Sequence, residues 1–129
     1  KYFTNLQNSN NSSILLFSTV AVQTGMPYHA SVASAKGAVE GLTRSLAAEF
    51  APKIRVNAIA PSLTDTPMAS RLLSSVEKKE TSAKRHPLNS FGKPEEIAKA
   101  AAYLLSDDSA WITGQIMHID GGISSLKIL

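Results

Sequence analysis

The feature that most constrains the fold is a helix-length segment, residues 32–50, that lies between two short apolar runs. The run at 14–17 is continuously apolar and bounded by turn-forming residues, as expected for a strand buried on both faces of a parallel sheet. The run at 54–60 follows Pro52, and its β-branched residues Ile54, Val56 and Ile59 favour a second strand. Parallel neighbours need a crossover between them, so the pattern predicts a βαβ unit.

The remaining chain continues this alternation. Residues 1–7 read as the last turns of a helix, and 8–13 as a polar loop. We expect a helix over 68–84 and another from Pro94, where Glu95 and Glu96 complement the helix dipole. Residues 115–120 predict the last strand. The expected fold is α/β: a parallel, Rossmann-like, doubly wound sheet with three strands and flanking helices, in one domain over 1–129.

Composition excludes several classes of function. The net charge is +3, but the 13 Lys and Arg residues are scattered and form no stripe with aromatic residues, which argues against nucleic-acid binding. No apolar run is long enough to cross a bilayer, so we expect no membrane association and a cytoplasmic location. The absence of cysteine excludes disulfides and thiolate metal sites, and no His spacing suggests a metal site of another kind.

Four segments, in order, resemble the short-chain dehydrogenase/reductase family. Residues 33–47 (ASAKGAVEGLTRSLA) resemble its active-site helix, and 54–61 (IRVNAIAP) with 66–68 (TPM) its strand and loop beside the nicotinamide. Residues 92–98 (GKPEEIA) resemble its next helix start, and 112–115 (ITGQ) with 119–122 (IDGG) its terminal strand. The resemblance covers about residues 14–122 and identifies the C-terminal half of a family member.

The family's Gly-rich turn, which holds the pyrophosphate of the cofactor, has no counterpart in this sequence. The chain opens with Lys1 in the middle of an expected helix, so we expect a fragment of a longer protein. The resemblance implies NAD or NADP as the cofactor of the complete protein. We expect this chain alone to bind neither.

The catalytic signature is incomplete. In the family, Tyr-x-x-x-Lys supplies a general acid or base whose pKa the lysine lowers, and a hydroxyl thirteen residues before the tyrosine hydrogen-bonds the same substrate oxygen. Lys36 matches the lysine and Thr19 the hydroxyl, but Val32 occupies the tyrosine position. Valine has no proton to give. Lys36 could otherwise be a helix lysine with a solvated charge, and Thr19 a strand-end hydrogen bonder.

Two nearby residues are candidates for a substitute acid. Tyr28 lies in the loop before the helix, where a packing role is the simpler interpretation, and His29 could titrate near neutral pH or only be solvated. By resemblance, the cofactor would contact Lys36 and the loop after the second strand, through Pro61, Ser62, Thr64 and Thr66. Ser62 replaces a family glycine, which predicts a different loop path.

Three functions follow. The first is an NAD(P)-dependent oxidoreductase acting on a carbonyl or alcohol, with altered acid catalysis. The second is a non-catalytic scaffold or binding module that self-associates, which Val32 favours. The third is a purely structural fragment. The expected partners are a small-molecule substrate and either the missing N-terminal half or further copies, as a homodimer or homotetramer, which would cover the apolar edge at 14–17.

Overall fold

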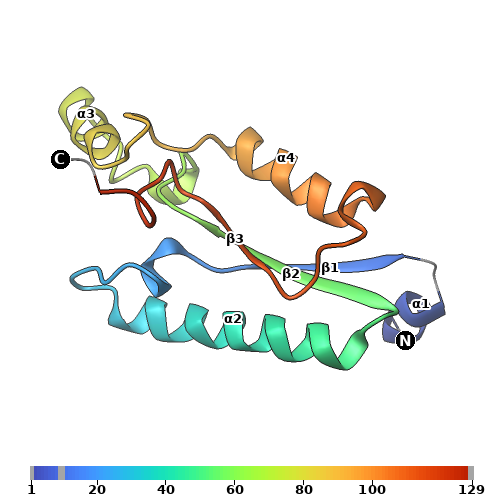
Figure 1. Ribbon diagram of the computed structural model, residues 1–129. Helices are drawn as coiled ribbons and strands as arrows, with labels where there is room; N and C mark the ends of the chain where they lie inside the picture. The colour runs from blue at the N-terminus through green and yellow to red at the C-terminus, as the bar shows by residue number, and fades with distance from the viewer. Residues whose placement is uncertain (1, 9–10, 128–129) are drawn as a thin grey trace.

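The structure is a computed structural model that describes residues 2–8 and 11–127. Its centre is a three-stranded parallel sheet of β1 (Ser12–Phe17), β2 (Ile54–Pro61) and β3 (Ile116–Ile119), in the order β1-β2-β3. The longer helix α2 (Ala30–Phe50) covers one face, and α4 (Pro94–Leu105) covers the other (Figure 1). The predicted parallel α/β arrangement with three strands and flanking helices is therefore confirmed.

The other elements lie at the two ends of the sheet. Helix α1 (Tyr2–Asn8) precedes β1, as the sequence predicted, and Ser12 Oγ donates to Leu6 O at 2.6 Å. The turn η1 (Val20–Val22) follows β1 and η2 (Pro67–Ala69) follows β2, while η3 (Asp107–Ser109) follows α4. Helix α3 (Val76–Lys84) lies beyond the carboxyl ends of the strands (Figure 1). In the described part of the chain, none of the helices combines the length and apolar character needed to cross a bilayer.

The expected helix over 68–84 is wrong in its first half. The chain forms η2 and then a series of turns before α3 begins at Val76, with Ser75 Oγ accepting from Lys78 N at 3.2 Å. Serine is a strong N-cap because its hydroxyl satisfies a free helix N–H, so the second of two adjacent serines starts a new helix. The start of α2 also differs, since it begins at Ala30.

Strand β2 is the centre of the core. Seven of its eight residues are buried, and the Val56, Ala58 and Ile59 side chains are fully inaccessible. Ala47 of α2 packs with Ile54 and Val56, and Leu46 and Phe50 lie against this cluster. By contrast β1 is only half buried and forms one edge of the sheet, and the Phe17 side chain is 46% exposed.

The buried face of α2 is only partly apolar: Leu46 and Phe50 pack against the core, but two of its buried residues are polar. Glu40, Thr43 and Ala47 are its buried residues, whereas Leu42 is 49% exposed. Thr43 is satisfied within the helix, because its Oγ1 donates to Val39 O at 2.8 Å. Apolar side chains of α2 are thus left on its outer surface.

Candidate active site

The carboxyl end of β1 carries the two signature residues. Lys36 Nζ donates to Phe17 O at 2.8 Å, so the ammonium lies at the last residue of the strand. Thr19 follows two residues later and begins η1, where its Oγ1 accepts from Ala21 N at 3.4 Å. The Thr19 hydroxyl hydrogen and two of the three ammonium hydrogens remain available for another acceptor. The structure therefore places donors of both residues at one end of the sheet.

The face of α2 that carries Lys36 also carries Glu40, one turn later. Glu40 is 9% exposed, and Ser18 Oγ donates to its Oε1 at 2.6 Å. Ser18 N also donates to Ile59 O at 2.7 Å, which ties the end of β1 to β2. Sequence reasoning missed this pair, because Ser18 and Glu40 are 22 residues apart and no local pattern links them.

Val32 lies one turn before Lys36 in α2, as the alignment of the signature requires, and its side chain is 39% exposed. Tyr28 has a positive φ of 64° and a fully exposed side chain. His29 Nδ1 lies 2.7 Å from Pro27 O, within the same loop. Both candidate acids are thus on the solvent side of the loop before α2.

The loop after β2 is held from both sides. Pro61 is the last residue of β2, and Ser62 N donates to Ile119 O at 3.2 Å. Thr64 Oγ1 donates to Ser62 O at 3.0 Å, and Thr64 forms a parallel bridge with Gly92. A Cβ at Gly92 would lie 3.2 Å from Thr64 Oγ1, so glycine permits this close approach.

Within this loop, Ser62 adopts an ordinary backbone conformation, because the described non-glycine residues with positive φ are Asn11, Tyr28 and Asn89. Replacing the family glycine by serine therefore needs no strained backbone here. Thr66 begins η2 without a side-chain capping hydrogen bond, which leaves its hydroxyl able to contact a ligand.

A buried histidine lies behind Ser62. His86 is 3% exposed, its Nε2 lies 2.8 Å from Ser62 Oγ, and its Nδ1 lies 2.9 Å from Ser82 O. A carbonyl oxygen can only accept, so in the neutral ring Nδ1 carries the hydrogen and Nε2 accepts from the Ser62 hydroxyl. The chain Ser62–His86–Ser82 links the end of β2 to α3. The sequence gives no signal for this contact, because Ser62 and His86 are 24 positions apart.

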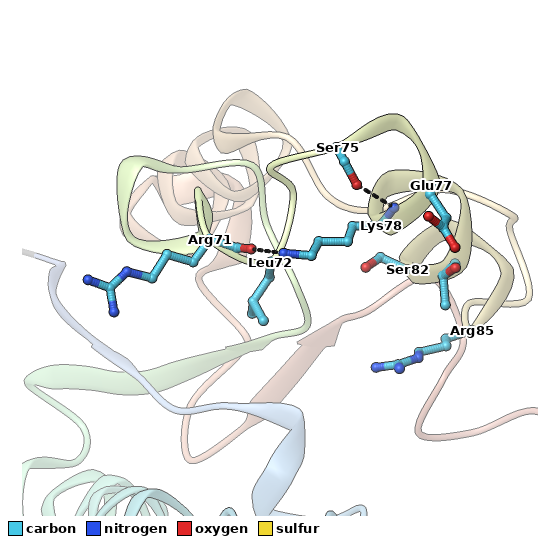
Figure 2. Close-up of a pocket in the computed structure, with 8 residues that line it drawn as sticks. Arg71, Leu72, Ser75, Glu77, Lys78, Ser82 and Arg85 are labelled. Carbon is cyan, nitrogen blue, oxygen red and sulfur yellow. Dashed lines mark hydrogen bonds between the residues drawn. The ribbon is translucent and has the colours of Figure 1, made fainter.

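A hollow of about 400 Å³ lies on the other side of Ser82, between α3 and the turns before it (Figure 2). Three cations line it, together with one carboxylate, three hydroxyls and one apolar residue: Arg71, Lys78, Arg85, Glu77, Ser75, Thr81, Ser82 and Leu72. The sequence predicted a continuous helix over 68–84, but the turns that separate Arg71 from α3 could not be read from that pattern.

Two buried polar side chains, Asn57 and Asp120, have structural roles. Asn57 is inaccessible to solvent; its Nδ2 donates to Ile112 O at 2.9 Å, and its Oδ1 accepts from Gln115 N at 3.0 Å. Asp120 accepts from Gly122 N at 2.8 Å and from Ser124. Across residues 2–8 and 11–127, no three His, Asp or Glu side chains gather in a way that could hold a metal ion.

The parallel pairing of β1 with β2 brings the signature residues after β1 and the loop after β2 to the same end of the sheet. Phe17 is in register with Ile59, so the segment containing Thr19 and the loop from Pro61 leave the sheet at the same end. Lys36, Thr19 and Thr66 then supply unused N–H and O–H donors at this end. These donors fit the ribose hydroxyls and carboxamide of a nicotinamide nucleotide. The Gly-rich pyrophosphate turn has no counterpart in the sequence.

Comparison with known proteins agrees with this geometry. The family model described as enoyl-(acyl carrier protein) reductase matches residues 1–124. The 3-oxoacyl-[acyl-carrier-protein] reductase of Thermotoga maritima is 43% identical over 114 residues, covering 88% of this chain and 46% of that protein. An inactive 2-(S)-hydroxypropyl-CoM dehydrogenase of Xanthobacter autotrophicus is 40% identical over 119 residues, covering 88% of this chain and 52% of that protein.

Solved structures show the same fold. The gluconate 5-dehydrogenase of Burkholderia cenocepacia, determined with NADP and tartrate, superposes with a TM-score of 0.87 at 28% identity, covering 97% of this chain and 49% of that one. The chain thus spans about half the length of the relatives it matches. The strand order, the signature segments and these matches together show that the chain belongs to the short-chain dehydrogenase/reductase family, whose oxidoreductases use NAD(P).

Proposed function

We propose that this chain is the C-terminal half of an NAD(P)-dependent oxidoreductase that interconverts a carbonyl and an alcohol. The observation that carries the proposal is the Lys36 ammonium, held 2.8 Å from Phe17 O at the carboxyl end of β1, two residues before Thr19. The match to about half of each relative supports the assignment to one half of a longer domain.

The residues have separate roles in this proposal. Thr19 donates its hydroxyl hydrogen to the substrate oxygen, and Lys36 binds the nicotinamide ribose while its positive charge favours an anionic oxygen nearby. The loop carrying Pro61, Ser62, Thr64 and Thr66 contacts the carboxamide side of the nicotinamide. When bound, NAD(P)H supplies the hydride to the carbonyl carbon. This chain alone, without the pyrophosphate turn, binds neither NAD nor NADP well.

No group at the tyrosine position can protonate the substrate oxygen, because Val32 has an aliphatic side chain. Tyr28 and His29 lie in the loop before α2, and both side chains are exposed to solvent. A positioned general acid contributes about 10²–10⁴-fold. The proposed enzyme is therefore slow with a simple carbonyl unless one of these residues, or water, replaces the tyrosine.

The second candidate is a non-catalytic binding module that self-associates. It is favoured by Val32 and by the existence of an inactive relative at 40% identity. Two surfaces support a homodimer or homotetramer: the outer side of α2, where Leu42 is half exposed, and the segment before β3, where Trp111 is fully exposed. We propose a cytoplasmic location for either function.

The test is an assay of the protein expressed from its complete coding sequence. NADPH and NADH oxidation with a panel of ketones is compared for the natural protein, Lys36→Ala and the control Lys99→Ala, an exposed lysine of α4. The oxidoreductase proposal expects turnover that only Lys36→Ala abolishes. Cofactor binding without turnover, measured by fluorescence titration, would instead select the non-catalytic module.

A further inference from the structure

We propose that His86 is a positioning residue: through its hydrogen bond with the Ser62 hydroxyl, it holds the loop after β2 in the conformation that binds the nicotinamide nucleotide. This inference rests on the proposed oxidoreductase function, because it assigns a role in that function to a residue outside the family signature. It depends on the burial of His86, on its two hydrogen bonds, and on the segments that meet around it.

His86 lies where three segments of the chain meet. Its Nδ1 is 2.9 Å from the carbonyl oxygen of Ser82 in α3. Its Nε2 is 2.8 Å from Oγ of Ser62, the residue that follows β2. Its Cβ and ring also pack on Gly121, after β3, where an added Cβ would lie 3.3 Å from the His86 Cβ. One buried side chain thus joins α3 to the segments that follow β2 and β3.

The roles of the two ring nitrogens follow from the partner of Nδ1. The carbonyl oxygen of Ser82 can only accept, so Nδ1 carries the hydrogen of the neutral ring, and Nε2 accepts from the Ser62 hydroxyl. Both nitrogens are therefore satisfied although His86 is only 3% exposed. A side chain that replaces His86 must present an acceptor at the position of Nε2 if Ser62 is to remain held.

Holding Ser62 also fixes the residues that follow it. The carbonyl oxygen of Ser62 accepts from Thr64 Oγ1 at 3.0 Å. Further along, Asp65 N donates to Gly92 O at 2.9 Å. The loop is thus anchored at its start by His86 and near its middle by Gly92. A loop that is ordered before the ligand arrives lowers the entropic cost of binding, so this anchoring favours the cofactor.

The contacts of the signature residues lie on the β1 side and do not involve His86. Lys36 Nζ donates to Phe17 O at 2.8 Å. Thr19 Oγ1 accepts from Ala21 N at 3.4 Å. Loss of His86 should therefore weaken cofactor binding but leave the chemical step unchanged once cofactor is saturating. A loop that spends about one tenth of its time in the binding conformation raises the cofactor Kd about tenfold.

The experiment separates the two hydrogen bonds with three variants of the protein expressed from its complete coding sequence. His86→Gln places an amide oxygen near the position of Nε2 and can still accept from Ser62. His86→Asn places an amide nitrogen near the position of Nδ1 and can keep only the bond to Ser82. His86→Phe keeps a ring but neither bond. Lys84→Gln, at the exposed end of α3, is the control.

Binding of NADPH and NADH is measured by fluorescence titration, and KM and kcat for ketone reduction by steady-state kinetics. We expect His86→Phe and His86→Asn to raise the cofactor Kd about tenfold, with kcat at saturating cofactor within about twofold of the natural value. His86→Gln and Lys84→Gln should bind cofactor like the natural protein. An unchanged Kd in all variants, or equal losses in His86→Gln and His86→Phe, would overturn the positioning role.

Hydrogen exchange of the Asp65 amide tests the same contact without cofactor. This N–H is bonded to Gly92 O, so its exchange is slow while the loop is held. Exchange about tenfold faster in His86→Phe and His86→Asn, but not in His86→Gln, would support the role of His86 in fixing the loop. If the natural protein then shows no turnover, only the oxidoreductase is overturned. Turnover by the natural protein, with equal Asp65 exchange and equal Kd in all variants, would do the reverse.

Discussion

Ser18 Oγ donates a 2.6 Å hydrogen bond to Glu40 Oε1, and the two buried side chains join the end of β1 to the middle of α2. Glu40 lies one turn after Lys36 on the same helix, so this bond fixes the helix face that presents the ammonium. The position of the signature lysine therefore depends on a contact between residues that are not part of the signature.

Loss of the Ser18 hydroxyl should cost more than neutralising Glu40. Ser18→Ala leaves a buried carboxylate oxygen without its donor, which costs roughly 1–3 kcal/mol of unfolding free energy. Glu40→Gln keeps an amide oxygen that still accepts from Ser18, so we expect a smaller loss. Urea unfolding of both variants checks this, and a larger loss in Glu40→Gln would contradict it.

Arg55 should not be replaceable by lysine. It is 7% exposed, and its guanidinium donates to Leu104 O at 2.9 Å, Ser109 Oγ at 2.8 Å and Ser106 O at 3.0 Å. A lysine cannot reproduce this planar fork, so Arg55→Lys should lower the unfolding free energy by about 2–4 kcal/mol. The control Arg44→Lys, on the exposed side of α2, should change it by less than about 0.5 kcal/mol.

Asp120 should make stability depend on acid pH. Burial works to raise the pKa of its carboxyl, but hydrogen bonds from Ser124 Oγ and from the N–H groups of Gly122 and Ser124, with nearby His118, lower it below its ordinary 3.8. The stabilisation is therefore full above pH 3.8 and is lost as pH falls through the lower folded value. Urea unfolding at several pH values should show a shallower acid loss in Asp120→Asn, with the exposed Asp108→Asn as the control.

Substitutions at Ser62 and His86 should have non-additive effects on the free energy of unfolding. His86→Phe keeps a ring of similar size but removes both hydrogen bonds, leaving Ser82 O and Ser62 Oγ without them. We expect it to cost about 1–3 kcal/mol of unfolding free energy. Adding Ser62→Ala should cost less in the His86→Phe background than in the natural protein, with a coupling energy of about 0.5–3 kcal/mol. Strict additivity would show that the pair does not interact.

Val32→Tyr should restore acid catalysis. Val32 lies one turn before Lys36 and is 39% exposed, so a tyrosine ring can extend to solvent without displacing the core. Because a positioned acid contributes roughly 10²–10⁴-fold, kcat for ketone reduction by the complete protein should rise at least about tenfold. Val32→Phe, which adds the ring without the hydroxyl, should not raise it. No gain with tyrosine, while cofactor still binds, would contradict the role assigned to this position.

Most helices and strands could be predicted from the sequence because the residue patterns that specify them are local. Strand β2 has β-branched residues after a proline, and α4 begins at Pro94, where Lys93 N donates to Glu96 Oε2 at 2.8 Å. The order of these signals was enough to predict a parallel sheet and the family.

Long-range contacts could not be predicted in the same way. Glu40 can lie on the buried face of α2 because Ser18, 22 residues earlier, donates a hydrogen bond to its carboxylate. The periodicity of a helix carries no information about such a distant partner. His86 contacts Ser62 across 24 residues for the same reason. The site residues Thr19, Lys36 and Thr66 come from the family signature, and their catalytic roles remain predictions.

Each strand of the sheet pairs only with its neighbour in the sequence, since the spatial order β1-β2-β3 is also the chain order. During synthesis on the ribosome, β1 and β2 can therefore pair as soon as α2 has emerged, and β3 can add to the finished edge of β2. Asn57 and Thr113 fasten the incoming segment just before β3 begins. The layer can then grow in one direction, away from the outer edge of β1, which has no neighbouring strand among the described residues.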